Sequence, residues 1–175
     1  MLKMGIIGLG KMGEFHINWM TPENQLDLIA GCEKNQKRAE ELRKKYDFPI
    51  YTDVDEFLSR EKELDFAVIV TTHESHEFLT IKCLDAGVNV IVEKPMTMTF
   101  ESAQRMVAAA EKNKKHLFVH QSSRWDREFL LLKETIESGK LGDILQIESK
   151  ATFCDEGWPE WGVEGSDNPW RIKAE

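Results

Sequence analysis

Cysteine is scarce in this 175-residue sequence, and its placement excludes two common kinds of small protein. Cys32, Cys83 and Cys154 form no Cys-x-x-Cys pair of the kind used in many metal sites. Their odd number and wide spacing provide no disulfide framework. We therefore expect a protein of a reducing compartment, with the cytoplasm as the best fit.

Long apolar runs and an excess of basic residues are also missing. No hydrophobic run approaches the roughly 18 residues of a membrane span, and the apolar stretch after Met4 is interrupted at Lys11, too early for a signal peptide. The 23 Lys and Arg are outnumbered by 31 Asp and Glu, giving a net charge of −8. Nucleic acid and anionic membranes are therefore not expected as partners.

Short apolar runs alternate with helix-like segments through the first two thirds of the sequence. The runs are rich in β-branched residues, as in parallel strands buried on both faces, and cover residues 2–7, 26–32, 66–70, 89–92 and 117–120. Helix starts are predicted at Asn35, at a capping box of Thr52 and Asp55, and at Ser75 and Thr99. This order predicts an α/β fold with a doubly wound parallel sheet, a Rossmann fold.

We expect a domain boundary after residue 122, and the alternating pattern itself fails after residue 152. A helix carrying Phe129, Leu132 and Ile136 is expected to end at Gly139, and a strand is expected over residues 144–152. The residues that follow are acidic and contain three tryptophans without a regular period. Residues 123–175 are therefore predicted to begin a second α/β domain that is incomplete here.

A G-x-G-x-x-G motif, Gly8 to Gly13, directly follows the first expected strand and opens the first expected helix. The first glycine permits a tight turn, the second lets the backbone approach a pyrophosphate, and the third allows close helix packing. The helix N-terminus attracts the negative charge. The motif predicts a dinucleotide site at Gly8, Gly10, Lys11 and Met12, with a chance glycine-rich loop as the alternative.

Glu33 lies 20 residues after Gly13, at the end of the second expected strand. A carboxylate at this place can accept hydrogen bonds from both adenosine ribose hydroxyls, which favours NAD over NADP. Two alternatives remain open. Glu33 could be a solvated strand-end charge, or Lys34, Lys37 and Arg38 could attract the 2′-phosphate of NADP.

Glu93, Lys94 and Pro95 follow the most apolar strand, at the carboxyl edge where open α/β sheets bind ligands. An ammonium there could bind a substrate hydroxyl, stabilise alkoxide character as hydride leaves the carbon, and help a neighbouring base. We predict that Lys94 is catalytic. The alternative is an exposed Glu–Lys pair at a strand end.

The histidines do not suggest a metal site by their spacing. His73 and His76 are three residues apart, whereas the His-Glu-x-x-His motif of zinc enzymes needs four. His76 is expected near a helix start beside the cofactor, or as a surface imidazole. His16, His116 and His120 are expected to be structural.

Taken together, these motifs resemble the Gfo/Idh/MocA family, named after glucose-fructose oxidoreductase, inositol dehydrogenase and a rhizopine catabolism protein. The resemblance covers the whole chain and is carried by residues 5–13, 68–72 with His76, 93–96, 123–125, 136–144 and 170–171. The combination of Glu-Lys-Pro with the Ser-Gly-Lys-Leu-Gly segment is more specific than the glycine motif alone.

The resemblance implies an NAD(P)-binding Rossmann domain, here residues 1–122, followed by a domain that covers the substrate and often mediates oligomers. It implies reversible oxidation of a sugar or cyclitol hydroxyl, with a homo-oligomer as the full-length form. It also implies residue roles: Thr71, Thr72 and His76 border the cofactor, Glu93 and Lys94 reach the nicotinamide side, Gln121 sits near the ring, and Arg171 contacts cofactor or substrate. Lys94 matches the family's catalytic lysine, whereas Thr72 and Trp125 depart from the residues usual at their positions.

Length is the main departure from the family pattern. The resemblance implies an Asp and a His that work with the lysine and come just after the Trp-Arg motif, but this sequence ends at Glu175. We expect an N-terminal fragment that keeps the cofactor site, lacks this acid/base pair and is inactive alone. The alternatives are a glycosidase-type member that uses NAD for transient oxidation, and a nucleotide-binding regulator without turnover.

Overall fold

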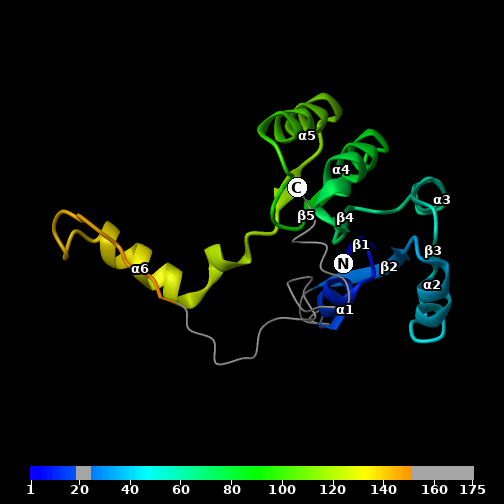
Figure 1. Ribbon diagram of the computed structural model, residues 1–175, viewed down its shortest axis with the longest axis horizontal. Helices are drawn as coiled ribbons and strands as arrows, with labels where there is room; N and C mark the ends of the chain where they lie inside the picture. Colours follow the sequence, from blue (N-terminus) through cyan, green and yellow to red (C-terminus); the bar gives the residue numbers. More distant parts are fainter. Residues whose placement is uncertain (19–24, 151–175) are drawn as a thin grey trace. The chain divides into compact units, whose positions relative to one another are not determined.

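The computed structural model describes residues 1–18 and 25–150 of the chain (Figure 1). The chain divides into two compact units, Met1–Gln121 and Ser122–Glu175. We treat each unit separately. That the second unit begins a substrate domain stays a prediction.

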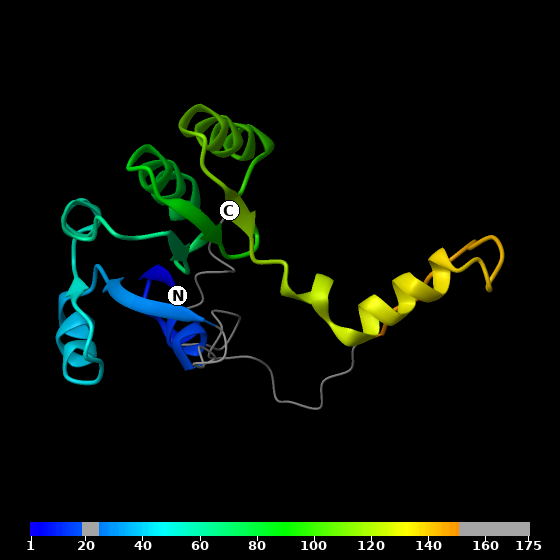
Figure 2. The ribbon, with the colours of Figure 1, turned by 180° about the vertical axis from the view of Figure 1, so that it is seen from behind.

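Six parallel strands form one sheet in the first unit, in the order β3-β2-β1-β4-β5-β6 (Figures 1 and 2). They are β1 (Leu2–Ile7), β2 (Leu26–Cys32), β3 (Ile50–Tyr51), β4 (Phe66–Ile69), β5 (Asn89–Val92) and β6 (Leu117–Val119). This is the strand order of a Rossmann sheet, so the predicted fold class is confirmed. The sequence pattern does not predict β3, because its two residues are too few to show a period.

The strands are joined by helices and one short turn. They are α1 (Lys11–Asn18), α2 (Gln36–Arg43), α3 (Val54–Arg60), a 3₁₀ turn η2 (His73–Ser75), α4 (His76–Asp85) and α5 (Phe100–Asn113). In the second unit, a turn η3 (Ser122–Trp125) precedes α6 (Arg127–Glu137). No helix within the described ranges is long and apolar enough to span a membrane.

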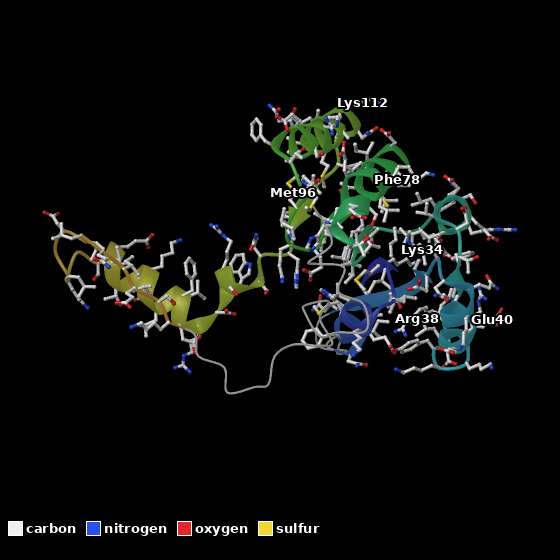
Figure 3. All side chains as sticks on the ribbon, viewed as in Figure 1. Lys34, Arg38, Glu40, Phe78, Met96 and Lys112 are labelled. Carbon is white, nitrogen blue, oxygen red and sulfur yellow. The ribbon has the colours of Figure 1, made fainter. Side chains whose placement is uncertain are left out.

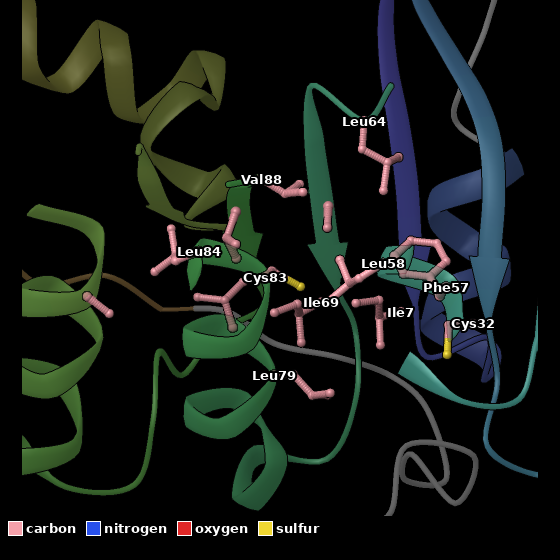
Figure 4. Close-up of a cluster of buried hydrophobic side chains, with 14 of the residues drawn as sticks. Ile7, Cys32, Phe57, Leu58, Leu64, Ile69, Leu79, Cys83, Leu84 and Val88 are labelled. Atoms are coloured by element: carbon pink, nitrogen blue, oxygen red, sulfur yellow. The ribbon is translucent and has the colours of Figure 1, made fainter. Parts of the chain in front are cut away.

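The two faces of the sheet pack against different helices. Ile7, Ile69 and Val92 join the cluster formed with α3, α4 and α5, which Figure 4 shows in close-up. Ile6 and Val68, one residue earlier on their strands, join the cluster formed with α1 and α2. Successive side chains of a strand point to opposite faces, so one residue step decides which helices a side chain meets. The same alternation decides toward which face of the sheet the residue after each strand points.

Helix starts agree with the sequence at three places and differ at one. Ser75 directly precedes α4 as predicted, although its side chain makes no capping hydrogen bond. The Asn35 side chain accepts the Arg38 amide before α2, and the Thr99 side chain accepts the Ser102 amide before α5, as predicted. At α3 the predicted capping box of Thr52 and Asp55 is wrong, because Asp53 is the cap and accepts the amides of residues 55 and 56. A carboxylate can take two amides at once and also favours the positive end of the helix.

The predicted strand over residues 144–152 is not formed in its described part, residues 144–150. A strand needs a neighbour for its backbone hydrogen bonds, and none is paired with this segment among the residues that the structure describes. Residues 151 and 152 lie outside those residues. The preceding helix does end as predicted, with Gly139 at a φ of 71° just after α6.

Candidate cofactor and active site

The strand register aligns a row of residues along the carboxyl edge of the sheet. The last pairs across β2, β1, β4, β5 and β6 join Cys32, Ile7, Ile69, Val92 and Val119. The next residue of each strand forms the edge row: Glu33, Gly8, Val70, Glu93 and His120. Backbone hydrogen bonds continue this row, for example from Gly8 N to Cys32 O at 2.8 Å and from His120 N to Val92 O at 2.8 Å. Residues 33, 8, 93 and 120, far apart in sequence, therefore share one edge.

The three glycines of the motif have different surroundings. Gly8 has a φ of 95°, and a Cβ there would lie 2.3 Å from Val70 O. A Cβ on Gly13 would lie 2.2 Å from Gly8 O. Gly10 is different, because its Cβ would meet nothing within 4 Å among the residues that the structure describes. Gly8 and Gly13 are thus required by the protein's own packing, whereas Gly10 borders open space at the N-terminus of α1, where a dinucleotide phosphate fits.

Glu33 is held against the glycine loop at the end of β2. It is buried, so the alternative of a solvated strand-end charge is wrong. Its Oε2 accepts the amide of Leu9 at 3.0 Å, and its Oε1 accepts the amide of Asn35 at 2.9 Å. These two bonds fix the carboxylate beside the loop on which the adenosine half of a dinucleotide would lie.

The cations that could attract a 2′-phosphate differ in how they are engaged. Arg38, on α2, donates from Nε to Leu9 O at 2.6 Å and from Nη2 to Glu14 Oε2 at 2.7 Å. Lys34 lies in the turn before α2 and is exposed (Figure 3). The Arg38 guanidinium is therefore committed to the loop and to α1, which leaves it fewer donors for a phosphate.

His76 joins the segments that follow β4 and β5. It is fully buried, so the surface-imidazole alternative is wrong. Its Nδ1 lies 2.9 Å from Pro95 O, and its Nε2 lies 3.2 Å from Thr71 O. Thr71 also accepts a 2.7 Å hydrogen bond from Ser75 Oγ, and Thr72 precedes η2. This set places Thr71, Thr72 and His76 on the same edge as Lys94.

A carboxylate between two imidazoles is the least expected feature of the edge. Val92 and Val119 face α3, α4 and α5, so Glu93 and His120 face the side of α1, where they meet His16. Glu93 Oε1 lies 2.9 Å from His16 Nε2 and 2.8 Å from His120 Nδ1. We call these three residues the His16–Glu93–His120 cluster. Glu93 Oε2 accepts the backbone amide of Lys94 at 3.0 Å.

Two histidines and a carboxylate could also hold a metal ion. The ligand atoms of the His16–Glu93–His120 cluster lie within 4.8 Å of one another. The nitrogen–oxygen distances of 2.8 and 2.9 Å are those of hydrogen bonds, and these account for the grouping without an ion. The ring of His73 lies 5.6 Å from the ring of His76, between centroids.

Hydrogen bonding controls the charge of this cluster. Burial by itself would raise the pKa of Glu93, but the bonds from His120 and His16 outweigh it, and the pKa is lowered. The bond to Glu93 raises the pKa of His120, although burial opposes this and the charge of Lys94 lowers it. The ionised form of Glu93 and the protonated form of His120 thus stabilise each other.

These shifts predict a pH-dependent contribution to stability. The raised pKa of His120 stabilises the folded state fully below the ordinary His value of about 6.5, and this contribution is lost as pH rises through the folded value. The lowered pKa of Glu93 adds stability that is lost as pH falls below about 4.3. His120→Asn, which cannot take a charge, should therefore cost most between these limits, by several tenths to about 1 kcal/mol for a partly exposed pair. Urea unfolding of the unsubstituted chain and of His120→Asn, at pH 5.5 and at pH 8.5, measures how the loss of stability depends on pH.

The control for this prediction is His116→Asn, at the opposite end of β6. Its backbone amide bonds Asn89 Oδ1, and its ring stacks on Phe118, so it does not touch Glu93. This variant should show no such pH-dependent difference. Equal destabilisation by His120→Asn at both pH values would contradict the charge argument.

The remaining predicted site residues lie in different situations. Lys94 is exposed at the carboxyl edge, and Gln121 is exposed after β6 with its amide bonded to Val119 O at 2.7 Å. Arg171 lies outside the described residues. Cys32 and Cys83 are buried, and burial raises the pKa of each thiol to about 12, so neither is a candidate nucleophile.

The sequence did not predict that His16 and His120, which were expected to be structural, would both contact Glu93. The position of His120 in the sequence could have predicted its contact with Glu93. His120 directly follows β6 as Glu93 directly follows β5, and the ends of adjacent parallel strands meet at one edge of the sheet. Nothing in the sequence pairs His16 with either of them. That contact depends on how α1 packs over the sheet.

Comparisons with known proteins agree with this geometry. The uncharacterized oxidoreductase YdgJ of Escherichia coli (strain K12) is 33% identical over 174 residues, which is 94% of this chain and 48% of YdgJ. The scyllo-inositol 2-dehydrogenase (NADP(+)) IolW of Bacillus subtilis (strain 168) is 32% identical over 148 residues, 82% of this chain and 39% of IolW. The chain thus spans less than half the length of these relatives.

Solved structures share the fold. The WlbA dehydrogenase from Bordetella pertussis, solved in complex with NADH and UDP-GlcNAcA, superposes with a TM-score of 0.76 at 25% identity. The similarity covers 81% of this chain and 43% of WlbA. Residues 2–121 match the family described as "Oxidoreductase family, NAD-binding Rossmann fold". The sheet order, the glycine loop and this match agree, and the chain belongs to the Gfo/Idh/MocA family of oxidoreductases.

Proposed function

We propose that this chain is the cofactor-binding part of a dehydrogenase that transfers hydride between NAD and a hydroxyl of a sugar or cyclitol. The observation that carries the proposal is the open space at Gly10, on a carboxyl edge that also holds Glu33 and Lys94. A phosphate-binding loop, a ribose-binding carboxylate and an ammonium on one edge are what such a reaction requires. A relative named for scyllo-inositol and a neighbour solved with a nucleotide sugar support this substrate class.

The residues fit the cofactor in the following way. Gly8, Gly10, Lys11 and Met12 would hold the pyrophosphate, and Glu33 the adenosine ribose. Thr71, Thr72 and His76 are proposed to border the cofactor, Glu93 to reach its nicotinamide side and Gln121 to lie near the ring. Arg171 is proposed to contact cofactor or substrate. When bound, NAD supplies the hydride acceptor. Lys94 would hydrogen-bond the substrate oxygen and stabilise its developing negative charge.

NAD is proposed over NADP, although a relative named for NADP(+) is among those that match. The carboxylate of Glu33 would repel a 2′-phosphate, and Arg38 is engaged by Leu9 and Glu14. We expect NADH to bind at least about tenfold tighter than NADPH, which corresponds to about 1.4 kcal/mol. Fluorescence titration of the chain with each nucleotide measures this ratio.

Lys34→Ala is the matched control for the titration, because Lys34 is an exposed cation that directly follows Glu33 in the sequence. The substitution should leave NADH affinity unchanged. Equal or tighter binding of NADPH by the unsubstituted chain, lost in Lys34→Ala, would establish the NADP alternative. Failure to bind either nucleotide would remove the proposed site.

The reaction is tested with inositols, hexoses and sugar acids, by following NADH absorbance with the full-length protein and with residues 1–175. We expect substrate-specific NADH formation by the full-length protein and none by the chain alone, because proton removal from a hydroxyl needs a positioned base that contributes about 10² to 10⁴-fold. Robust turnover by the chain alone would contradict the fragment hypothesis. Cleavage of a glycoside without net reduction would favour the glycosidase alternative, and binding without turnover the regulator.

Two further properties complete the proposal. The full-length protein is proposed to be a homo-oligomer that acts on a small-molecule polyol or sugar. Its proposed location is the cytoplasm, because Cys32 and Cys83 are buried free thiols.

A further inference from the structure

Glu93 connects three segments of the chain through one side chain. Its Oε1 contacts His16 from α1 and His120 from the end of β6, and its Oε2 accepts the amide of Lys94. Glu93 is buried, with only 7% of its surface exposed. Both carboxylate oxygens of Glu93, the residue before the proposed catalytic lysine, are therefore held by hydrogen bonds.

The hydrogen bonds assign the protons of both imidazoles. An ionised carboxylate only accepts hydrogen bonds, so each ring nitrogen that contacts Oε1 must carry a proton. His16 then has its proton on Nε2, and His120 has its proton on Nδ1. Both rings contact the same oxygen, and their centroids lie 4.8 Å apart.

Losing either donor would affect Lys94 through Glu93. A buried carboxylate that loses a hydrogen bond is poorly satisfied, and it gains by turning toward water. Because Oε2 of the same group holds the Lys94 amide, such a turn would release the backbone that aims the lysine. Displacements of about 1 Å at a reacting group can cost about 10²-fold in rate.

We infer that His16 and His120 are positioning residues for Lys94, acting through Glu93. The inference rests on the proposed dehydrogenase function for its kinetic consequence, but the arrangement itself can be tested without turnover. The role differs from simple support of the fold because it depends on a donor at one defined nitrogen of each ring.

Nuclear magnetic resonance of the chain tests the arrangement directly. The ¹⁵N shifts of the imidazoles should show a protonated Nε2 in His16 and a protonated Nδ1 in His120 near neutral pH. The Lys94 amide proton should resonate downfield, as a donor to a carboxylate does. In His120→Leu this signal should move upfield, whereas His120→Asn should keep it, because the Asn amide nitrogen can take the place of imidazole Nδ1.

Kinetics of the full-length protein test the consequence. His16→Leu and His120→Leu should each lower kcat about tenfold or more, with the KM for NAD changed less than about threefold, since the lysine and not the cofactor loop is misplaced. His16→Gln keeps a donor at the position of Nε2, and His120→Asn keeps one at Nδ1. Both should stay within about threefold of the unsubstituted kcat. His116→Leu, remote from Glu93, is the control that should not change it.

The outcomes separate the inference from the proposed function. If the unsubstituted protein oxidises no polyol, the proposed function fails, while the imidazole and Lys94 signals still decide the arrangement. Opposite protonation of either ring, an unmoved Lys94 signal in His120→Leu, or full turnover in both leucine variants would overturn the inference. Tight binding of added ZnCl₂ that perturbs both imidazoles would also overturn it, in favour of a metal site. If a leucine variant does not fold, the glutamine and asparagine variants and the proton assignments still decide it.

Discussion

Replacing Gly10 with alanine is expected to weaken NADH binding by about 10- to 100-fold while the fold remains intact, the size expected when an added methyl costs 1–3 kcal/mol at a tight contact. A Cβ at Gly10 meets nothing within 4 Å in the described part of the chain, so it would occupy space that the pyrophosphate needs. The free energy of unfolding should change by about 1 kcal/mol or less, the usual cost of exchanging glycine for alanine at a helix start. Fluorescence titration and urea unfolding of the same preparation measure both.

Gly13→Ala is the matched control, because it makes the same chemical change three residues away. Its Cβ would lie 2.2 Å from the backbone oxygen of Gly8, so the loop or α1 must move. This variant should lose about 1–3 kcal/mol or more of stability. If Gly10→Ala binds NADH normally, or is destabilised as much as Gly13→Ala, the assignment of Gly10 to the cofactor is wrong.

Lys94→Ala in the full-length protein is expected to lower kcat by about 10² to 10⁴-fold, the range for losing a group that acts on the proton or the charge of the transition state. NADH affinity should stay within about threefold, because a group that acts mainly on developing charge affects kcat more than ground-state binding. Lys94 is exposed on the carboxyl edge, so removing its side chain leaves no cavity in the core. Steady-state kinetics with a polyol substrate, together with NADH titration, separate the two effects.

Two further variants sharpen the assignment of Lys94. Lys94→Arg keeps the positive charge but changes the shape and acidity of the group, so it should recover little activity if proton handling matters. Lys34→Ala removes an exposed lysine on the adenosine side and should leave kcat unchanged. If turnover survives in Lys94→Ala while NADH affinity collapses, the lysine anchors the cofactor and is not catalytic.

The fold could be predicted because the strong patterns are local. The apolar runs at β1, β2 and β5 have the bounds that the sequence indicates, and Asn35 and Thr99 cap the helices as expected. Errors occurred where the local signal was short or ambiguous. β3 has only two residues, and Thr52 and Asp53 are adjacent residues that can both cap a helix. The strand expected over residues 144–152, of which 144–150 are described, needed a partner that the local pattern does not contain.

By itself, the sequence determined the parallel sheet, the glycine loop after β1, and the placing of Glu33 and Lys94 after strands, because period and spacing are properties of a contiguous segment. Only the tertiary structure decided which glycine borders open space, since that depends on the Val70 and Gly8 carbonyl oxygens that approach Gly8 and Gly13. Only the tertiary structure joined His16, Glu93 and His120, because they come from one helix and two strand ends up to 104 residues apart, counted from His16 to His120. The pairing of β5 with β6 and the packing of α1 over that face bring these side chains within hydrogen-bond distance, which no local pattern encodes.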